Sequence, residues 1–215
     1  MSTSHTPVSA SHRGIDLLMQ LAAARPLEAV CDSFYFLRHG QTARNAQRIF
    51  QGPDEPLDAT GLAQARRAAD YLAQESLAAI ACSPLPRARS TADIVAAAHG
   101  LAPQVHDGLR ERHFGALIGS SSAQIDWACA PEGGETLDAF IARAREGLRW
   151  ALEQPGPVLV VAHGGTLYAL AGLLGVSLSA ALLANAHPLH FERQPRGWQL
   201  RALAPSAPGA SHNLA

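Results

Sequence analysis

The sequence predicts an α/β fold, a three-layer α/β/α sandwich in which helices cover both faces of a mostly parallel central sheet. Short apolar segments alternate along the chain with segments whose apolar residues recur at helical spacing. Residues 158–162 are continuously apolar between glycine-containing turns, which is typical of a strand buried on both faces and therefore of a parallel sheet. Three of the predicted strands are each followed at once by residues suited to catalysis or anion binding.

The chain divides into three parts. We expect residues 1–30 to form an N-terminal arm and a short helix, because 1–13 are polar and the apolar residues from Ile15 to Leu27 have helical spacing. Residues 31–204 are expected to form one domain, and residues 205–215 to form a loose C-terminal tail. Two interpretations of the helix stay open: it packs on the surface of the domain, or it binds a partner, which includes the formation of a homodimer.

The first half of the domain contains two predicted strands and two predicted helices. The apolar run at 33–37 predicts the first strand, and 78–82 predicts the second. Apolar residues share one face of a helix expected over 60–74. A second helix is expected over 86–99, because a proline stands in its first turn and Gly100 follows its end.

The second half begins with the clearest helix, over 136–152, whose apolar residues recur at helical spacing. The apolar run at 158–162 predicts a strand, and 166–174 predicts the next helix. Two late strands are expected at 187–193 and 197–204, on either side of a turn that contains proline and glycine.

Composition excludes several classes of function. The chain has 215 residues and a formal net charge of -1, so its overall charge does not indicate nucleic acid or an anionic membrane as a partner. The three cysteines are far apart and form no C-x-x-C pair, which favours a reducing compartment over a disulfide framework or a zinc knuckle. We expect a cytoplasmic protein, since no apolar run approaches the length of a membrane span and the start makes a poor signal peptide.

The residues that follow three strands predict an anion site. Arg38 and His39 follow the first strand, a segment ending in Arg87 follows the second, and His163 follows the strand at 158–162. If these strands are parallel, their carboxyl ends meet at one edge of the sheet, where open α/β sheets bind ligands. A guanidinium group can bind a phosphoryl group through two hydrogen bonds, and a neutral imidazole can attack it. No carboxylate directly follows any of the three strands, so the site is cationic and suits phosphate.

Four segments carry a resemblance to a known family. They are LRHGQTARN at 37–45, SPLPRARSTA at 83–92, LRERHFG at 109–115 and VVAHG at 160–164. Together they resemble the histidine phosphatase superfamily, the phosphoglycerate-mutase-like proteins, over roughly residues 33–190. The resemblance implies a phosphoglycerate-mutase-like fold and a hydrolase that acts without a metal ion.

The resemblance implies five catalytic residues. His39 is expected to be the nucleophile that becomes phosphohistidine, and Arg38, Arg87 and His163 to bind the phosphoryl oxygens. Glu111 is expected to protonate the leaving oxygen and then to activate water. His39 must be neutral to attack, while His163 is more useful when charged, so we expect their environments to separate the two.

The resemblance also implies five substrate-binding residues. Asn45 is expected to contact the same phosphate, and Thr42 to help line the pocket. Gln51 and Gly52 are expected near the organic part of the substrate, with Gly164 beside them. No cofactor and no metal ligand are implied, because arginine and imidazolium supply the positive charge. The expected partner is a small phosphomonoester, such as a sugar phosphate or a nucleotide fragment.

The family contains both phosphatases and mutases, and the sequence favours a phosphatase. Mutases carry a long insertion after the segment that matches 109–115, with basic residues that hold a second anionic group. The corresponding segment here, 115–135, is short and contains no lysine or arginine. Gly165 stands where mutases have asparagine. A phosphoglycerate mutase and a non-catalytic phosphometabolite-binding protein remain the alternatives. A serine esterase is disfavoured, because its G-x-S-x-G motif is absent and residues 119–123 lack the second glycine.

Overall fold

The computed structural model describes residues 14–123 and 125–203, which form a layered α/β domain around a six-stranded sheet in the order β3-β2-β4-β1-β5-β6. Neighbours among the first four strands are parallel, and the last two strands are antiparallel to their neighbours. The strands are β1 (Ser33–Arg38), β2 (Ala79–Cys82), β3 (Gln104–Val105), β4 (Val158–Ala162), β5 (Pro188–Gln194) and β6 (Gly197–Ala202). The predicted mostly parallel sheet is confirmed.

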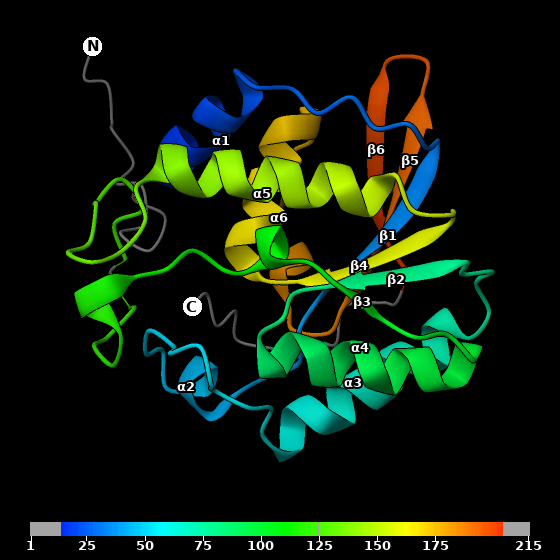
Figure 1. Ribbon diagram of the computed structural model, residues 1–215, viewed down its shortest axis with the longest axis horizontal. Helices are drawn as coiled ribbons and strands as arrows, with labels where there is room; N and C mark the ends of the chain where they lie inside the picture. Colours follow the sequence, from blue (N-terminus) through cyan, green and yellow to red (C-terminus); the bar gives the residue numbers. More distant parts are fainter. Residues whose placement is uncertain (1–13, 124, 204–215) are drawn as a thin grey trace, which may run out of the picture.

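Helices cover both faces of this sheet (Figure 1). On one face lie α1 (Ile15–Ala23), α5 (Leu137–Leu152) and α6 (Gly164–Leu174), and on the other lie α3 (Ala59–Leu72) and α4 (Pro86–His99). The short elements are α2 (Ala43–Ala46) and the 3-10 turns η2 (Asp107–Leu109), η3 (Gly115–Leu117) and η4 (Ala180–Leu183). The predicted three-layer sandwich is therefore confirmed.

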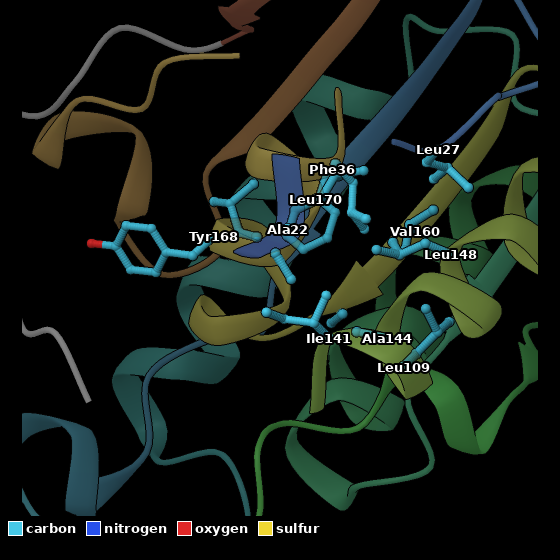
Figure 2. Packing of buried hydrophobic residues seen from close by; sticks show 14 of the residues in the cluster. Ala22, Leu27, Phe36, Leu109, Ile141, Ala144, Leu148, Val160, Tyr168 and Leu170 are labelled. Atoms are coloured by element: carbon cyan, nitrogen blue, oxygen red, sulfur yellow. The ribbon is translucent and has the colours of Figure 1, made fainter. Parts of the chain in front are cut away.

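Successive side chains of a strand point to opposite faces of the sheet, so the buried apolar residues form two clusters, one on each face. Phe36 and Val160 point to the face covered by α5 and α6, where they pack with Leu148 and Leu170 (Figure 2). Their sequence neighbours, such as Val161, belong to the cluster under α3 and α4. Every residue of β4 is buried, which explains why its sequence is continuously apolar.

The predicted elements agree closely with the structure where sequence signals are local. The helix α4 and the strand β4 have the predicted bounds. The helix α3 begins after Asp58, whose carboxylate accepts a 2.7 Å hydrogen bond from the backbone N–H of Gly61. The helix α6 begins at Gly164, two residues before the predicted start, so His163 stands at its N-cap.

The helix α1 packs on the domain, which is the first of the two interpretations of this segment. Its residues Ile15, Leu18 and Ala22 are buried in the same cluster as α5 and α6. A Cβ added to Gly172 of α6 would lie 2.6 Å from the Cβ of Ala22, so glycine lets the two helices approach closely. The predicted arm at 1–13 and the predicted tail lie outside the described residues. Across the described chain, no helix combines the length and the apolar character that crossing a membrane requires.

Candidate active site

The carboxyl ends of β1, β2 and β4 meet at one edge of the sheet. In the parallel ladders, Arg38 is level with Ala162, and Cys82 is level with Val161. The residues that follow these strands therefore meet, as the sequence predicts. A cavity of about 320 Å³ opens at this edge, and Arg38, His39, Arg87, Glu111 and Gly164 are among its lining residues.

The imidazole of His39 is buried and held in one tautomer. Its Nδ1 lies 2.7 Å from the carbonyl oxygen of Gly40. Because a carbonyl oxygen only accepts, Nδ1 carries the proton and Nε2 keeps its lone pair. Burial, followed by the charges of Arg87 and Arg38, holds the pKa of His39 well below its usual range. His39 is therefore a neutral imidazole with a nucleophilic nitrogen at physiological pH.

The backbone around His39 is fixed from several sides. Asn185 donates a 2.9 Å hydrogen bond from its side-chain amide to the carbonyl oxygen of His39. The N–H of Gly40 donates to the hydroxyl of Thr91 at 3.1 Å. A Cβ on Gly40 would overlap the carbonyl oxygen of Gly61 at the start of α3, so only glycine permits this approach.

His163 lies directly beside His39. The two rings meet edge to face, with centroids 5.1 Å apart and an interplanar angle of 61°. Nε2 of His163 is 2.8 Å from the hydroxyl oxygen of Ser83. Burial, followed by the charge of Arg87, also holds the pKa of His163 well below its usual range. Both histidines are buried near the same two guanidinium groups, so in this structure their surroundings lower both pKa values and do not separate the two residues.

Two buried guanidinium groups supply the positive charge. Arg38 is 3% exposed and donates to the carbonyl oxygen of Leu183 at 2.7 Å, and Arg87 is 2% exposed and donates to that of Gly52 at 3.1 Å. Burial lowers the pKa of Arg87 to about 10, so this side chain stays charged at neutral pH. By contrast, Arg89 is paired with Asp93 on the outer side of α4, at 3.1 Å.

The carboxylate of Glu111 is anchored by backbone N–H groups. One oxygen accepts from the N–H of Arg112 and the other from the N–H of Gly165, each at 2.9 Å. A Cβ on Gly165 would overlap Glu111 Oε1, so glycine allows the carboxylate to reach the first turn of α6. Glu111 is thus held at the edge of the cavity that contains His39 and both guanidinium groups.

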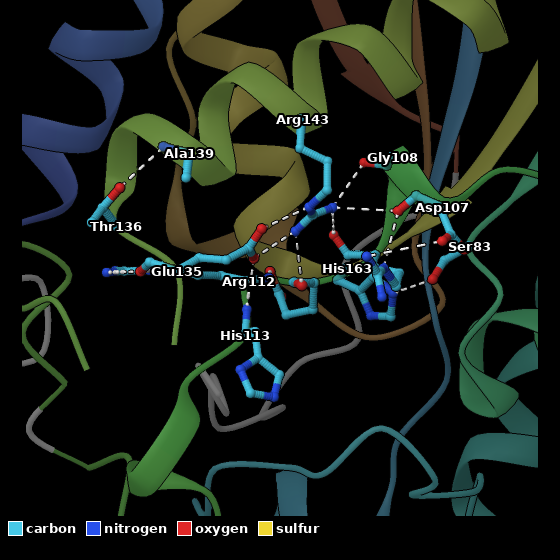
Figure 3. A network of polar contacts seen from close by, with 12 residues as sticks. Ser83, Asp107, Gly108, Arg112, His113, Glu135, Thr136, Ala139, Arg143 and His163 are labelled. Carbon is cyan, nitrogen blue, oxygen red and sulfur yellow. Dashed lines mark hydrogen bonds and ion pairs between the residues drawn. The ribbon is translucent and has the colours of Figure 1, made fainter. Parts of the chain in front are cut away.

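Two arginines that the sequence analysis did not select hold the loop carrying Glu111 (Figure 3). Arg143 of α5 pairs with the carboxylate of Glu135 at 2.7 Å and donates to carbonyl oxygens within residues 107–111. Arg112 donates to the carbonyl oxygens of Trp127, Cys129 and Glu135. Both side chains donate hydrogen bonds to backbone carbonyl oxygens of segments that are distant in the sequence. No local pattern in the sequence indicates such contacts.

The five predicted substrate-binding residues fall into two groups, one on the cavity and one outside its lining. Gln51, Gly52 and Gly164 line the cavity. Thr42 and Asn45 are fully buried and outside its lining: the hydroxyl of Thr42 donates to Oε1 of Gln51 at 2.8 Å and accepts from the N–H of Asn45 at 3.1 Å. Thr42 therefore positions Gln51 and caps the short helix α2.

The cavity also has an apolar wall that the sequence analysis did not anticipate. Phe50, Phe114, Trp127 and Tyr168 contribute aromatic rings to it. These four residues come from separate segments of the chain, so their proximity has no sequence signal. Within residues 14–123 and 125–203, no group of three or more histidine, cysteine, aspartate or glutamate side chains is placed to hold a metal ion.

Comparison with protein families gives one match that covers most of the chain. The model of the histidine phosphatase superfamily (branch 1) matches residues 34–205. The matched range includes the three strand ends that form the cavity and the loop that carries Glu111.

Two curated relatives are similar to this chain over most of its length. The chain is 33% identical over 176 residues to an agropine synthesis reductase from Rhizobium rhizogenes, which covers 77% of this chain but only 40% of that protein. It is 35% identical to a probable phosphoglycerate mutase from Photorhabdus laumondii, covering 75% of this chain and 79% of the relative. The chain thus spans about 40% of the length of the first of these relatives.

A solved structure shows the same fold. The mycobacterial glucosyl-3-phosphoglycerate phosphatase in complex with VO3 superposes with a TM-score of 0.66 at 31% identity. The superposition covers 82% of this chain and 100% of that one. The predicted phosphoglycerate-mutase-like fold is confirmed.

Proposed function

Because the chain belongs to the histidine phosphatase superfamily, we propose that it hydrolyses small phosphomonoesters through a phosphohistidine formed on His39. The observation that carries this proposal is a neutral His39, with Nε2 unprotonated, beside two buried cations. A guanidinium group can bind a phosphate dianion through two hydrogen bonds, and the charges of Arg38 and Arg87 both act on His39. The site is thus built to bind the group that His39 attacks.

In the first step, Nε2 of His39 forms a bond to phosphorus while the bond from phosphorus to the ester oxygen breaks. Arg38 and Arg87 stabilise the charge that spreads over the phosphoryl oxygens. Glu111 gives its proton to the departing oxygen, which leaves as an alcohol. His163 hydrogen-bonds to a phosphoryl oxygen, and the arriving dianion favours its protonated form.

In the second step, water attacks phosphorus and the bond to Nε2 of His39 breaks. Glu111, now ionised, accepts the proton of that water. Inorganic phosphate leaves, and His39 returns to its neutral state. The hydrogen bond from Nδ1 to the carbonyl oxygen of Gly40 holds the ring in the same tautomer for both steps. No metal ion or organic cofactor takes part in this scheme.

Hydrolysis is favoured over the mutase alternative by the composition of the loop beyond Glu111. Residues 115–135 contain no lysine or arginine that could hold a second anionic group. Without that group, a bisphosphate is not retained and water becomes the acceptor. The similarity to a named phosphatase of solved structure supports the same choice. We place the reaction in the cytoplasm, in keeping with three widely spaced free cysteines.

The test is a panel of phosphomonoesters, assayed without added metal, with the wild-type protein and with His39→Ala. We expect the wild type to hydrolyse several of them and His39→Ala to lose nearly all activity. Interconversion of 2- and 3-phosphoglycerate at a comparable rate would favour the mutase alternative. Binding of phosphate without turnover of any ester would favour the non-catalytic alternative.

A further inference from the structure

Four aromatic rings form a continuous apolar wall on the cavity. Phe50 and Phe114 have ring centroids 4.6 Å apart, Phe114 and Trp127 meet edge to face at 5.6 Å, and Trp127 and Tyr168 do so at 6.1 Å. All four line the cavity, and we call them the aromatic wall. In Figure 2 the phenol ring of Tyr168 points away from the rest of the core cluster.

Aliphatic side chains extend this wall, and one of them comes from the N-terminal helix. Ile15, Ile118 and Ile125 also line the cavity. Gly14, with a left-handed φ of 79°, lies so close to the segment 126–128 that a Cβ would be 2.5 Å from the backbone nitrogen of Ala128. The start of α1 therefore packs against the loop that carries Trp127 and contributes Ile15 to the same apolar surface.

The aromatic wall begins where the leaving group must lie. A Cβ added to Gly165 would overlap Glu111 Oε1 and would lie 2.9 Å from Cη2 of Trp127. The carboxylate and the edge of the indole therefore both pack against the same glycine. Since Glu111 protonates the ester oxygen in the proposed mechanism, the carbon atoms bonded to that oxygen start next to Trp127.

The other arginines on the cavity are Arg110, Arg112 and Arg143. Arg110 is exposed, and its Nε donates to the carbonyl oxygen of Asp107 at 3.3 Å. All three nitrogens of the Arg112 guanidinium donate to carbonyl oxygens of the chain. Those of Arg143 are bonded to the Glu135 carboxylate and to carbonyl oxygens of the loop at 107–111. The side chains beyond the phosphate end thus offer mainly apolar surface to the substrate.

We propose that the physiological substrate is the phosphomonoester of a small, apolar alcohol that carries a flat ring. This inference rests on the proposed phosphatase function and narrows its substrate class away from sugar phosphates. A ring stacked against Trp127 and Ile15 leaves water, whereas a sugar placed there loses hydrogen bonds to water without replacing them. The cavity of about 320 Å³ is at the small end of ligand sites, which suits an alcohol with one ring system.

The experiment compares propyl phosphate with 3-phenylpropyl phosphate, which have the same reacting group and differ only in the phenyl ring. We expect kcat/KM to be about 10- to 100-fold higher for 3-phenylpropyl phosphate, the gain expected for burying a phenyl-sized group. Glycerol 1-phosphate serves as the polar ester of similar length and should be hydrolysed no better than propyl phosphate.

Two variants locate the preference. Trp127→Ala should reduce the ratio of the two kcat/KM values to about threefold or less, because truncation removes the surface on which the ring stacks. Trp198→Ala is the matched control, since Trp198 packs on Phe34 at the distal edge of the sheet and does not line the cavity. A partly unfolded variant loses activity toward both esters equally, so the ratio reports contact with the ring.

Each outcome has one meaning. Equal or lower kcat/KM for 3-phenylpropyl phosphate, with hydrolysis of the other esters intact, overturns this inference but leaves the phosphatase function standing. A ratio that Trp127→Ala leaves unchanged also overturns it, because the preference then arises elsewhere. If the wild type hydrolyses none of these esters and none of the wider panel, the proposed function itself is wrong.

Discussion

The imidazole of His163 stands edge to face against the imidazole of His39, and both rings are buried and uncharged. Within residues 14–123 and 125–203, no carboxylate is placed to favour the protonated form of either ring. Arg38 and Arg87 lie close enough to oppose protonation of both rings. The buried positive charge of the site is therefore carried by guanidinium groups, and the histidines stay ready to accept a phosphoryl group or a proton.

This arrangement predicts a loss of stability in mild acid. The pKa values of both histidines are depressed in the folded chain, whereas the unfolded chain binds protons on them below a pH of about 6.5. The free energy of unfolding should therefore fall as the pH drops below 6.5, by up to about 1.4 kcal/mol per pH unit for each histidine. Urea unfolding between pH 7.5 and 5.5 measures this slope.

The variant His39→Gln removes one of the two groups and should have a shallower slope than the wild type over the same pH range. Identical slopes in the two proteins would show that His39 takes up a proton in the folded state as readily as in the unfolded one.

Two arginines on the same helix should respond very differently to truncation. Arg87→Ala removes a buried cation from the cavity, and we expect kcat/KM to fall by about 100-fold or more. Arg89→Ala removes only an exposed pair with Asp93, so its kcat/KM should stay within about twofold of the wild type. Steady-state kinetics with one ester measures both; similar losses in the two variants would contradict the proposed role of Arg87.

The role of Glu111 as an acid predicts a dependence on the leaving group. Glu111→Gln cannot donate the proton, so kcat/KM for an alkyl phosphate, which covers the steps up to loss of the alcohol, should fall by about 10² to 10⁴-fold. For 4-nitrophenyl phosphate the loss should be much smaller, because nitrophenolate leaves without protonation. The comparison of kcat/KM for the two esters tests this, because kcat also contains the second step, in which Glu111 activates water for both esters. An equal loss of kcat/KM for both esters would show that Glu111 is not the acid.

The glycine beside Glu111 gives an independent test of the same geometry. Gly165→Ala places a methyl group where the carboxylate now lies, so Glu111 must move. We expect the kcat/KM of the variant to fall for alkyl phosphates and to fall less for 4-nitrophenyl phosphate, as for Glu111→Gln. Thermal unfolding serves as the control for folding. If Gly165→Ala hydrolysed both esters with the kinetics of the wild type, the position of the Glu111 carboxylate would not be critical.

The sequence predicts those parts of the fold that local patterns encode. Apolar periodicity, a proline in the first turn and a glycine after the last turn define α4, and continuous apolarity defines β4. The strand β3 escapes prediction because it has two residues, both exposed. The helix α2 escapes because it has four residues and depends on the hydroxyl of Thr42 as its cap.

The same distinction applies to the site. Arg38, His39, Arg87 and His163 follow predicted elements directly, so a parallel sheet is enough to bring them together. The residues of the apolar wall reach the cavity only through long-range packing. Arg112 holds Trp127 through its carbonyl oxygen, and Ile15 comes from α1. No periodicity or motif marks such residues. The sequence also does not predict the lowered pKa values of His39 and His163, because these depend on how deeply the two rings are buried.

The central claim is that phosphorus becomes covalently attached to Nε2 of His39. The most direct test mixes the wild-type protein with ³²P-labelled 3-phenylpropyl phosphate, quenches the reaction in alkali within milliseconds and maps the label on peptides. We predict a label that is stable in alkali and lost in acid, located on the peptide that contains His39 and missing from His39→Gln. Turnover by the wild type with the label on another residue, or full turnover by His39→Gln, would contradict the account.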